Sequence, residues 1–190
     1  MAKANLQPSF PHELIYRIAF WGLAILLFFP PYFRGLFFAA EQEKALLFAA
    51  LVFWVVFTWC WLQGDYKFLA TPLDCFVLAL PVVYVFSSFV AVNKGLAVEE
   101  VVKNTLYFLT FWSVARIVRR QRDAESILKV IYISAVGVAM TGLATTTGLI
   151  DIIDGFKKGR IFSTYQYPNA LASLLGGVAF MGTYLWHRSG

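Results

Sequence analysis

The chain has 190 residues, of which 59% are hydrophobic and only 14% charged, and its mean hydropathy is +0.67. This composition excludes an ordinary soluble domain and indicates a membrane protein, so the net charge of +5 concerns topology and anionic lipid head groups, and no nucleic-acid partner is expected. Two cysteines, Cys60 and Cys75, and two histidines, His12 and His187, are too few and too scattered to indicate a disulfide framework, a zinc centre or a Ser/His/Asp triad.

Apolar runs follow one another along the chain, and several approach or exceed the roughly 20 residues that a helix needs to cross the hydrocarbon layer. Backbone amides in lipid must be satisfied within a helix or a closed barrel, and these runs lack the alternation of barrel strands. The sequence therefore predicts an all-α, polytopic transmembrane helix bundle of about six spans, as a single domain over 1–190. The predicted spans are residues 14–29, 44–62, 73–92, 97–118, 126–149 and 168–186.

The first apolar run, LIYRIAFWGLAILLFFPPYF, begins at Leu14 after a polar start that contains Lys3. It has no convincing small-residue cleavage site within reach, and Pro30 and Pro31 interrupt it near its end. We therefore interpret it as a retained first span and not as a cleaved signal peptide.

Helix-end signals define the next spans. Thr71 is a predicted N-cap of the third span, with Pro72 at the first helical position and Asp74 in the first turn. In the fourth span, Glu99 and Lys103 have the i,i+4 spacing of a helical ion pair. Both signals are structural and indicate no catalytic carboxylate.

The link between the fourth and fifth spans carries the densest cationic segment, RIVRRQR, followed by Lys129. The positive-inside rule places this link in the cytoplasm, and alternation from there places the N-terminus on the cytoplasmic side of the cell membrane as well. Seven of the sixteen lysines and arginines then lie outside: Arg34, Lys44, Lys94, Lys103, Lys157, Lys158 and Arg160.

Small residues four apart predict close helix packing in the fifth and sixth spans, because they let helix backbones approach in lipid. The pairs are Ala135/Ala139, Ala172/Gly176 and Ser173/Gly177.

The loop before the last span, DIIDGFKKGRIFSTYQYPNALAS, differs from the other loops. Its cations, Lys157, Lys158 and Arg160, lie on the side where positive charge is disfavoured. A structural interpretation exists, because Asp151 and Asp154 could balance two of the three cations in a solvated loop.

The second half of the same loop favours a phosphate site. Ser163 and Thr164 offer hydroxyls, and Pro168 suits the first position of a helix whose first turn contains Asn169. An exposed helix N-terminus with hydroxyls and a guanidinium nearby can receive phosphate oxygens. Arg160 is the first candidate ligand, because its planar fork can hold phosphate with two hydrogen bonds.

These residues resemble a known signature. Arg160 followed by FSTYQYPNALASLL is similar to the motif of the O-antigen ligase and O-antigen polymerase superfamily, in which an arginine and a Gly-Thr-Phe-like run precede an Asn/Asp-Pro-Asn that opens a transmembrane helix. Ser163 stands where glycine is common, and Tyr167 where Asn or Asp is common. The segment SSFVAVNKGLAVEEVVKNTLYFLTFW resembles the family's outer loop and following helix more weakly. The positions that match the motif are Arg160, Thr164, Tyr165, Pro168 and Asn169.

The resemblance implies a metal-independent, cofactor-free, inverting glycosyltransferase at the outer face of the cytoplasmic membrane. Such an enzyme moves a glycan from undecaprenyl diphosphate to an acceptor sugar or lipid, and its arginines hold the carrier diphosphate. Family members are longer and carry the catalytic histidine in a later external loop. The resemblance therefore implies that this chain is the N-terminal portion of such a fold, either a fragment or a truncated gene product, and that it has no turnover by itself. The expected diphosphate ligands are Arg160, Thr164, Asn169 and Lys158.

Two other functions stay open at this point. A transport or channel component would also have several helices and charged loops, but transporters place ionisable residues or broken helices at the membrane midplane, and the second, third and fifth spans show none. The second open function is that of a non-catalytic membrane subunit that assembles with a partner chain. The glycan, the acceptor, the choice between ligase and polymerase, and the catalytic residues are not indicated by the sequence.

Overall fold

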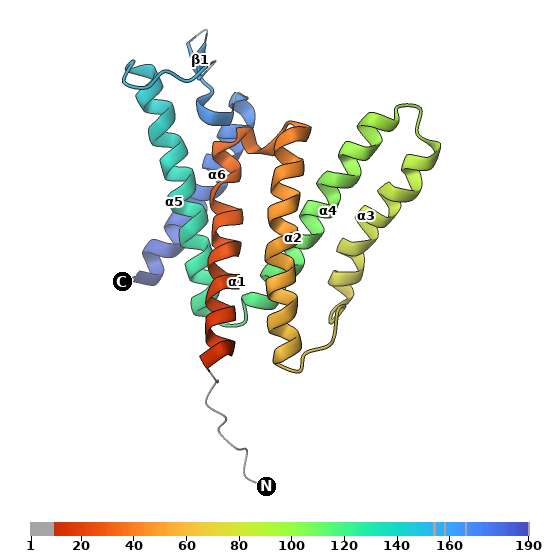
Figure 1. Ribbon diagram of the computed structural model, residues 1–190. Helices are drawn as coiled ribbons and strands as arrows, with labels where there is room; N and C mark the ends of the chain where they lie inside the picture. The colour runs from red at the N-terminus through yellow and green to blue at the C-terminus, as the bar shows by residue number, and fades with distance from the viewer. Residues whose placement is uncertain (1–9, 154, 158, 166, 190) are drawn as a thin grey trace. The chain divides into compact units, whose positions relative to one another are not determined.

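The computed structural model describes residues 10–153, 155–157, 159–165 and 167–189 (Figure 1). The described chain is almost entirely helical, which confirms the predicted all-α class. The long helices are α1 (Phe10–Phe28), α2 (Ala39–Leu62), α3 (Pro72–Val90), α4 (Lys94–Ile117), α5 (Gln121–Thr146) and α6 (Pro168–Ser189). Shorter elements are the 3-10 helices η1 (Pro30–Tyr32), η2 (Arg34–Leu36) and η3 (Ser163–Tyr165), and the antiparallel strands β1 (Phe156–Lys157) and β2 (Arg160–Ile161).

Four segments in the described part of the chain are long and apolar enough to cross a membrane: His12–Tyr32, Ala39–Leu62, Pro72–Val90 and Gln121–Thr146. The chain is therefore a membrane protein, and the predicted count of about six spans is too high by this measure. Helix α4 falls short because several charged side chains interrupt it, and α6 because its glycines and polar residues lower its hydropathy.

The described chain forms two compact units. Unit 1 consists of residues 10–23 and Gln42–Arg119, and it contains most of α1 and α2 and all of α3 and α4. Unit 2 consists of Ala24–Glu41 and residues 120–189, and it contains η1, η2, α5, the two strands, η3 and α6.

In unit 1, α3 and α4 form an antiparallel helical hairpin (Figure 1). The predicted start of α3 is confirmed. The backbone N–H of Asp74 donates to the Thr71 hydroxyl at 3.2 Å, and the N–H of Thr71 donates to the Asp74 carboxylate at 2.8 Å. This reciprocal capping box satisfies two backbone donors at the helix end.

The ion pair predicted in α4 has a different partner. Lys103 pairs with Glu100, and not with Glu99. Positions three and four residues apart are both neighbours on a helix surface, so spacing alone could not decide between the two carboxylates.

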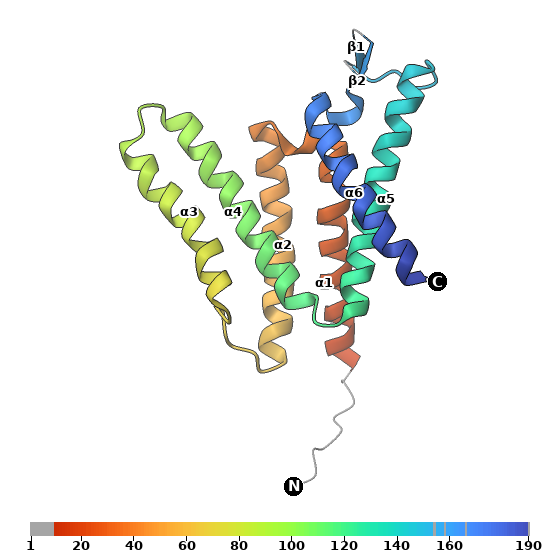
Figure 2. The same ribbon diagram turned by 180° about the vertical axis from the view of Figure 1, so that it is seen from behind.

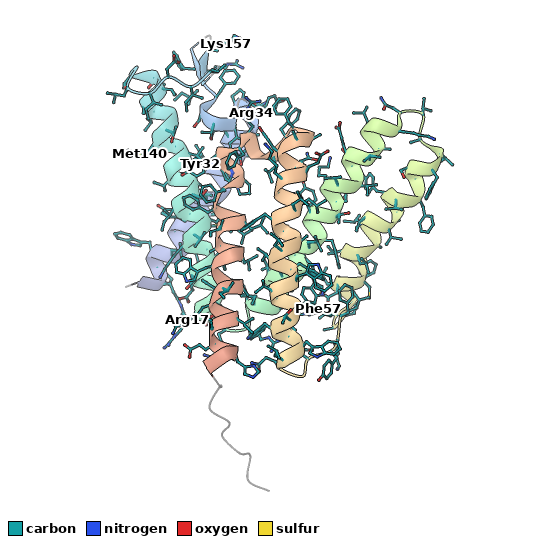
Figure 3. The ribbon with its side chains drawn as sticks, in the orientation of Figure 1. Arg17, Tyr32, Arg34, Phe57, Met140 and Lys157 are labelled. Carbon is teal, nitrogen blue, oxygen red and sulfur yellow. The ribbon has the colours of Figure 1, made fainter. Side chains whose placement is uncertain are left out.

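An aromatic cluster joins α2 to α4 in unit 1. The ring centroids of Phe53 and Trp112 are 4.8 Å apart, and Phe68, from the segment between α2 and α3, lies 5.6 Å from Trp112. Phe57, labelled in Figure 3, extends the cluster along α2. The indole N–H of Trp112 donates to the carbonyl oxygen of Phe68 at 2.7 Å, which holds the connecting segment against α4.

A buried ion pair lies beside this cluster. Nη2 of Arg116 is 3.3 Å from Oδ2 of Asp74, and the two side chains are only 8% and 1% exposed. The same nitrogen lies 2.8 Å from the carbonyl oxygen of Phe68, and the guanidinium carbon lies 5.1 Å from the centre of the Trp112 ring. One arginine of α4 therefore contacts the start of α3, the connecting segment and the aromatic cluster.

In unit 2, α5 and α6 run antiparallel beside one another (Figure 2). Ala135 of α5 is fully buried, as the small-residue spacing predicted. The prediction was wrong for α6, because Gly176 and Gly177 are exposed and a Cβ there would meet no described atom within 4 Å. The close approach uses Gly182 instead, where a Cβ would lie 2.8 Å from the Tyr132 ring. Spacing identifies a narrow helix face but not the helix that covers it.

Candidate functional site

Two loops meet at one end of unit 2, and we call them the paired loops. The first, residues 29–38, contains η1 and η2; the second, residues 147–167, contains the strands and η3. The Thr164 hydroxyl donates to the carbonyl oxygen of Pro31 at 2.7 Å. The Tyr165 ring lies directly against the backbone at Gly35. These two contacts bring together segments that are far apart in the sequence.

The second loop is anchored on α5 through a buried serine. Ser163 is fully buried, and its hydroxyl donates to the carbonyl oxygen of Val138 at 2.7 Å. Gly142 makes room for this contact, since a Cβ there would lie 2.9 Å from Ile161 and 3.1 Å from Ser163. Within the loop, the carbonyl oxygen of Gly155 accepts from two backbone N–H groups, those of residues 162 and 163. The loop therefore has a fixed position on the helix.

The first loop is anchored on the same helix. The Tyr32 hydroxyl donates to the carbonyl oxygen of Ser134 at 3.2 Å, and the Ser134 hydroxyl donates to the carbonyl oxygen of Phe28. Gly137 lies beside the Tyr32 hydroxyl, and a Cβ at this position would overlap it. Backbone carbonyls in the middle of α5, those of Ser134 and Val138, thus accept hydrogen bonds from both loops, which fixes the loops relative to each other.

Backbone strain gathers in the paired loops. Among the described residues, the non-glycine residues with positive φ are Arg34 (52°), Leu36 (59°) and Ser163 (51°), and all three lie in these loops. The left-handed conformation costs an L-residue roughly 1–2 kcal/mol. Strain of this kind persists where the surrounding contacts enforce it, and it clusters at functional sites.

Cations of both loops share this end of unit 2. Lys157 and Arg160 are directly opposite each other on the two-stranded ladder, and both are exposed. Two cations are therefore placed side by side at the surface of the second loop. Figure 3 shows Arg34 at the same end of the unit as Lys157. Arg34 is exposed and lies 3.9 Å from the Glu41 carboxylate.

The predicted site residues lie in different environments. Arg160 is exposed on β2, and Asn169 is exposed in the first turn of α6. Thr164 is half-buried, and its hydroxyl proton is used by Pro31. The hydroxyls of Ser163 and Thr164 therefore act as anchors of the loop. Lys158, and the charge balance proposed for Asp154, lie outside the described residues.

The first loop was missed by reasoning from sequence. Its signal was turn chemistry: Pro30-Pro31 followed by Arg34-Gly35 interrupts an apolar stretch. Nothing in that pattern indicated that the loop contacts Tyr165. Burial raises the pKa of the Tyr165 hydroxyl, so the side chain stays neutral at physiological pH and serves as a half-buried ring in the contact.

No cluster of three or more His, Cys, Asp or Glu side chains that could hold a metal ion occurs within the described ranges. The described residues of the paired loops include three cations, Arg34, Lys157 and Arg160, and one carboxylate, Asp151, so positive charge is in excess and favours anionic groups such as phosphate.

No protein-family model, curated protein or solved structure matches this chain. The resemblance of the segment after Arg160 to the O-antigen ligase superfamily therefore stays a hypothesis from its motif.

Proposed function

We propose that this chain is a multi-pass cell-membrane protein of the O-antigen ligase and polymerase type, and that its paired loops bind the diphosphate of an undecaprenyl-diphosphate-linked glycan at the outer face. The observation that carries the proposal is the ladder with Lys157 opposite Arg160, which lies on α5 and precedes the Pro-Asn start of α6, separated from it by η3. The strained residues of both loops and the second arginine, Arg34, support the same site.

The chemistry required of such a site is charge stabilisation. In glycosyl transfer, the bond between the sugar carbon and the carrier diphosphate breaks as an acceptor hydroxyl attacks from the opposite face, and the diphosphate leaves with both electrons. The hydroxyl proton passes to a base, a role that the family resemblance gives to a histidine in a later external loop. Preorganised guanidinium groups stabilise the charge that develops on the leaving oxygen, without a metal ion. We assign this role to Arg160. Lys157 and Arg34 add positive electrostatic potential, and Thr164 and Ser163 anchor the loop.

The test is binding of a purified polyprenyl-diphosphate-linked glycan to the purified protein in detergent. A charge-assisted contact to phosphate is worth roughly 1.5–3 kcal/mol. Arg160→Ala should therefore weaken binding about 10- to 100-fold. Arg160→Lys should recover only part of the loss, because one point charge replaces a planar fork. Lys157→Ala should cost less than Arg160→Ala, because the ammonium acts as a single point charge where the guanidinium offers a planar fork.

Arg17→Ala is the matched control, because Arg17 is also exposed but pairs with Glu13 within α1 of unit 1. It should leave donor binding unchanged. Equal losses at Arg160, Lys157 and Arg17 would reduce the site to a diffuse positive field. No donor binding by the unsubstituted protein would contradict the proposal and favour a non-catalytic membrane subunit.

A topology prediction follows from the same proposal. Lys157 and Gln121 are both exposed and lie at opposite ends of the α5 region of unit 2. After Cys60 and Cys75 are replaced by alanine, Lys157→Cys should react with a membrane-impermeant thiol reagent in intact cells, and Gln121→Cys should react only after permeabilisation. Reaction of Gln121→Cys alone in intact cells would reverse the predicted orientation.

A further inference from the structure

Unit 2 has a second cationic site at the end where α5 begins and α6 finishes. An open cavity of about 670 Å³ is lined there by Arg120, Gln121, Arg122, Glu125 and Arg188. We call it the arginine cavity. The paired loops adjoin the opposite end of α5, so the two sites are distinct (Figure 2).

The charges of the arginine cavity favour an anion. Three guanidinium groups and one carboxylate line it, which leaves two positive charges in excess. Nε of Arg188 lies 3.1 Å from the Glu125 carboxylate, so this arginine is already paired. Arg120 and Arg122 are exposed. Arg120 is the N-cap residue of α5 and Arg122 lies in its first turn, where the helix dipole adds positive potential.

The depth of the cavity is that of lipid head groups. Helix α5 is long and apolar enough to cross a membrane from Gln121 onwards, so the cavity lies at the end of its hydrophobic stretch. On α6, Trp186 is 83% exposed and Tyr184 45% exposed, close in sequence to Arg188. Exposed tryptophan and tyrosine at the end of a helix are typical of the membrane interface.

We propose that the arginine cavity binds the phosphate of an anionic phospholipid head group. Arg120 and Arg122 take the phosphate oxygens, and Arg188 orients towards the same cavity through its pair with Glu125. The positive-inside rule accounts for cations at this end of the protein, but it does not require three guanidinium groups to line one cavity. Basic pockets between transmembrane helices are suited to anionic head groups. This inference does not depend on the proposed function of the paired loops.

Native mass spectrometry of the purified chain tests the proposal with phosphatidylglycerol, and with phosphatidylcholine as the zwitterionic comparison. The unsubstituted protein should bind phosphatidylglycerol about 10-fold more tightly. Arg120→Gln/Arg122→Gln should remove most of this preference while phosphatidylcholine binding stays unchanged. Arg17→Gln, which removes an exposed guanidinium from unit 1, should alter neither.

A variant that is expected to strengthen lipid binding tests the proposal even if the double variant folds poorly. Glu125→Gln removes the only carboxylate of the cavity lining and should tighten phosphatidylglycerol binding about threefold. Unchanged phosphatidylglycerol affinity in both variants would overturn the proposal. Displacement of the lipid by a large excess of inorganic phosphate would show that the cavity serves a soluble anion, which would overturn its assignment to a lipid.

Discussion

Arg116→Met should lower the melting temperature of the purified protein by about 10 °C. The substitution keeps the apolar length of the side chain but leaves the Asp74 carboxylate, 1% exposed, without its counter-charge. Removing one partner of a buried ion pair costs about 3–5 kcal/mol. In a chain of this size each kcal/mol lowers the melting temperature by roughly 2–4 °C. The carbonyl oxygen of Phe68 also loses its guanidinium donor, which adds to the loss.

Two further variants separate the charge effect from lost packing. Asp74→Asn should also lower the melting temperature, because it leaves the Arg116 guanidinium buried without a carboxylate. Arg116→Met/Asp74→Asn should recover part of the stability, since no lone charge remains. The exposed pair of Arg119 with Asp65, at 2.9 Å, supplies the control: Asp65→Asn should shift the melting temperature by about 2 °C or less. If Arg116→Met lowered the melting temperature no more than Asp65→Asn, the buried pair would contribute no more to stability than the exposed pair.

Asp74 illustrates what could be predicted from sequence and what could not. Its capping role depends on Thr71, three residues away, and that part of the prediction is confirmed. Its second role is to pair with Arg116, which the sequence analysis assigned only to the cationic segment RIVRRQR. Local patterns describe contacts within about one turn of helix. The partner across the α3–α4 hairpin depends on how the two helices pack, and periodicity does not encode that.

Helix boundaries were likewise predicted well only where a local sequence signal marks them. The start of α6 at Pro168 and that of α3 at Pro72 were predicted to within a residue, because proline at the first helical position is a local signal. Helices α2 and α5 begin earlier than their predicted spans, at Ala39 and Gln121. The predictions followed apolar runs, whereas a helix continues past the hydrocarbon layer into polar residues that its backbone hydrogen bonds still accommodate.

At the candidate site, composition identified the second loop and missed the first. Misplaced cations and a Pro-Asn pair marked the segment around Arg160 as unusual. The partners of this segment, Pro31 and Gly35, lie near the start of the chain and have no charge pattern of their own. The hydroxyls that suggested a phosphate site, those of Ser163 and Thr164, donate to backbone carbonyls, so their contribution is to hold the loop in place.

Among the described glycines of the paired loops, Gly35 alone combines a positive φ with a close contact, and Gly35→Ala should lower the melting temperature by roughly 8 °C. Its φ of 65° is unfavourable for an L-residue by about 1–2 kcal/mol. In addition, a Cβ at Gly35 would lie 2.7 Å from Cε1 of Tyr165, and overpacking of this kind costs about 1–3 kcal/mol. The sum, about 3 kcal/mol, corresponds to the stated shift at roughly 2–4 °C per kcal/mol.

Gly148→Ala is the matched control, because Gly148 has a φ of 73° in the same unit and a Cβ there would meet no described atom within 4 Å. This variant carries the backbone strain without the collision and should shift the melting temperature by only about 4 °C. In a Tyr165→Ala background, Gly35→Ala should cost no more than Gly148→Ala, because the ring that it strikes is gone. Equal effects of Gly35→Ala in both backgrounds would show that the contact between Gly35 and Tyr165 does not hold the two loops together. If the paired loops form the diphosphate site, Gly35→Ala should also weaken donor binding, since the collision displaces the η3 segment that follows Arg160, whereas Gly148→Ala should leave binding unchanged.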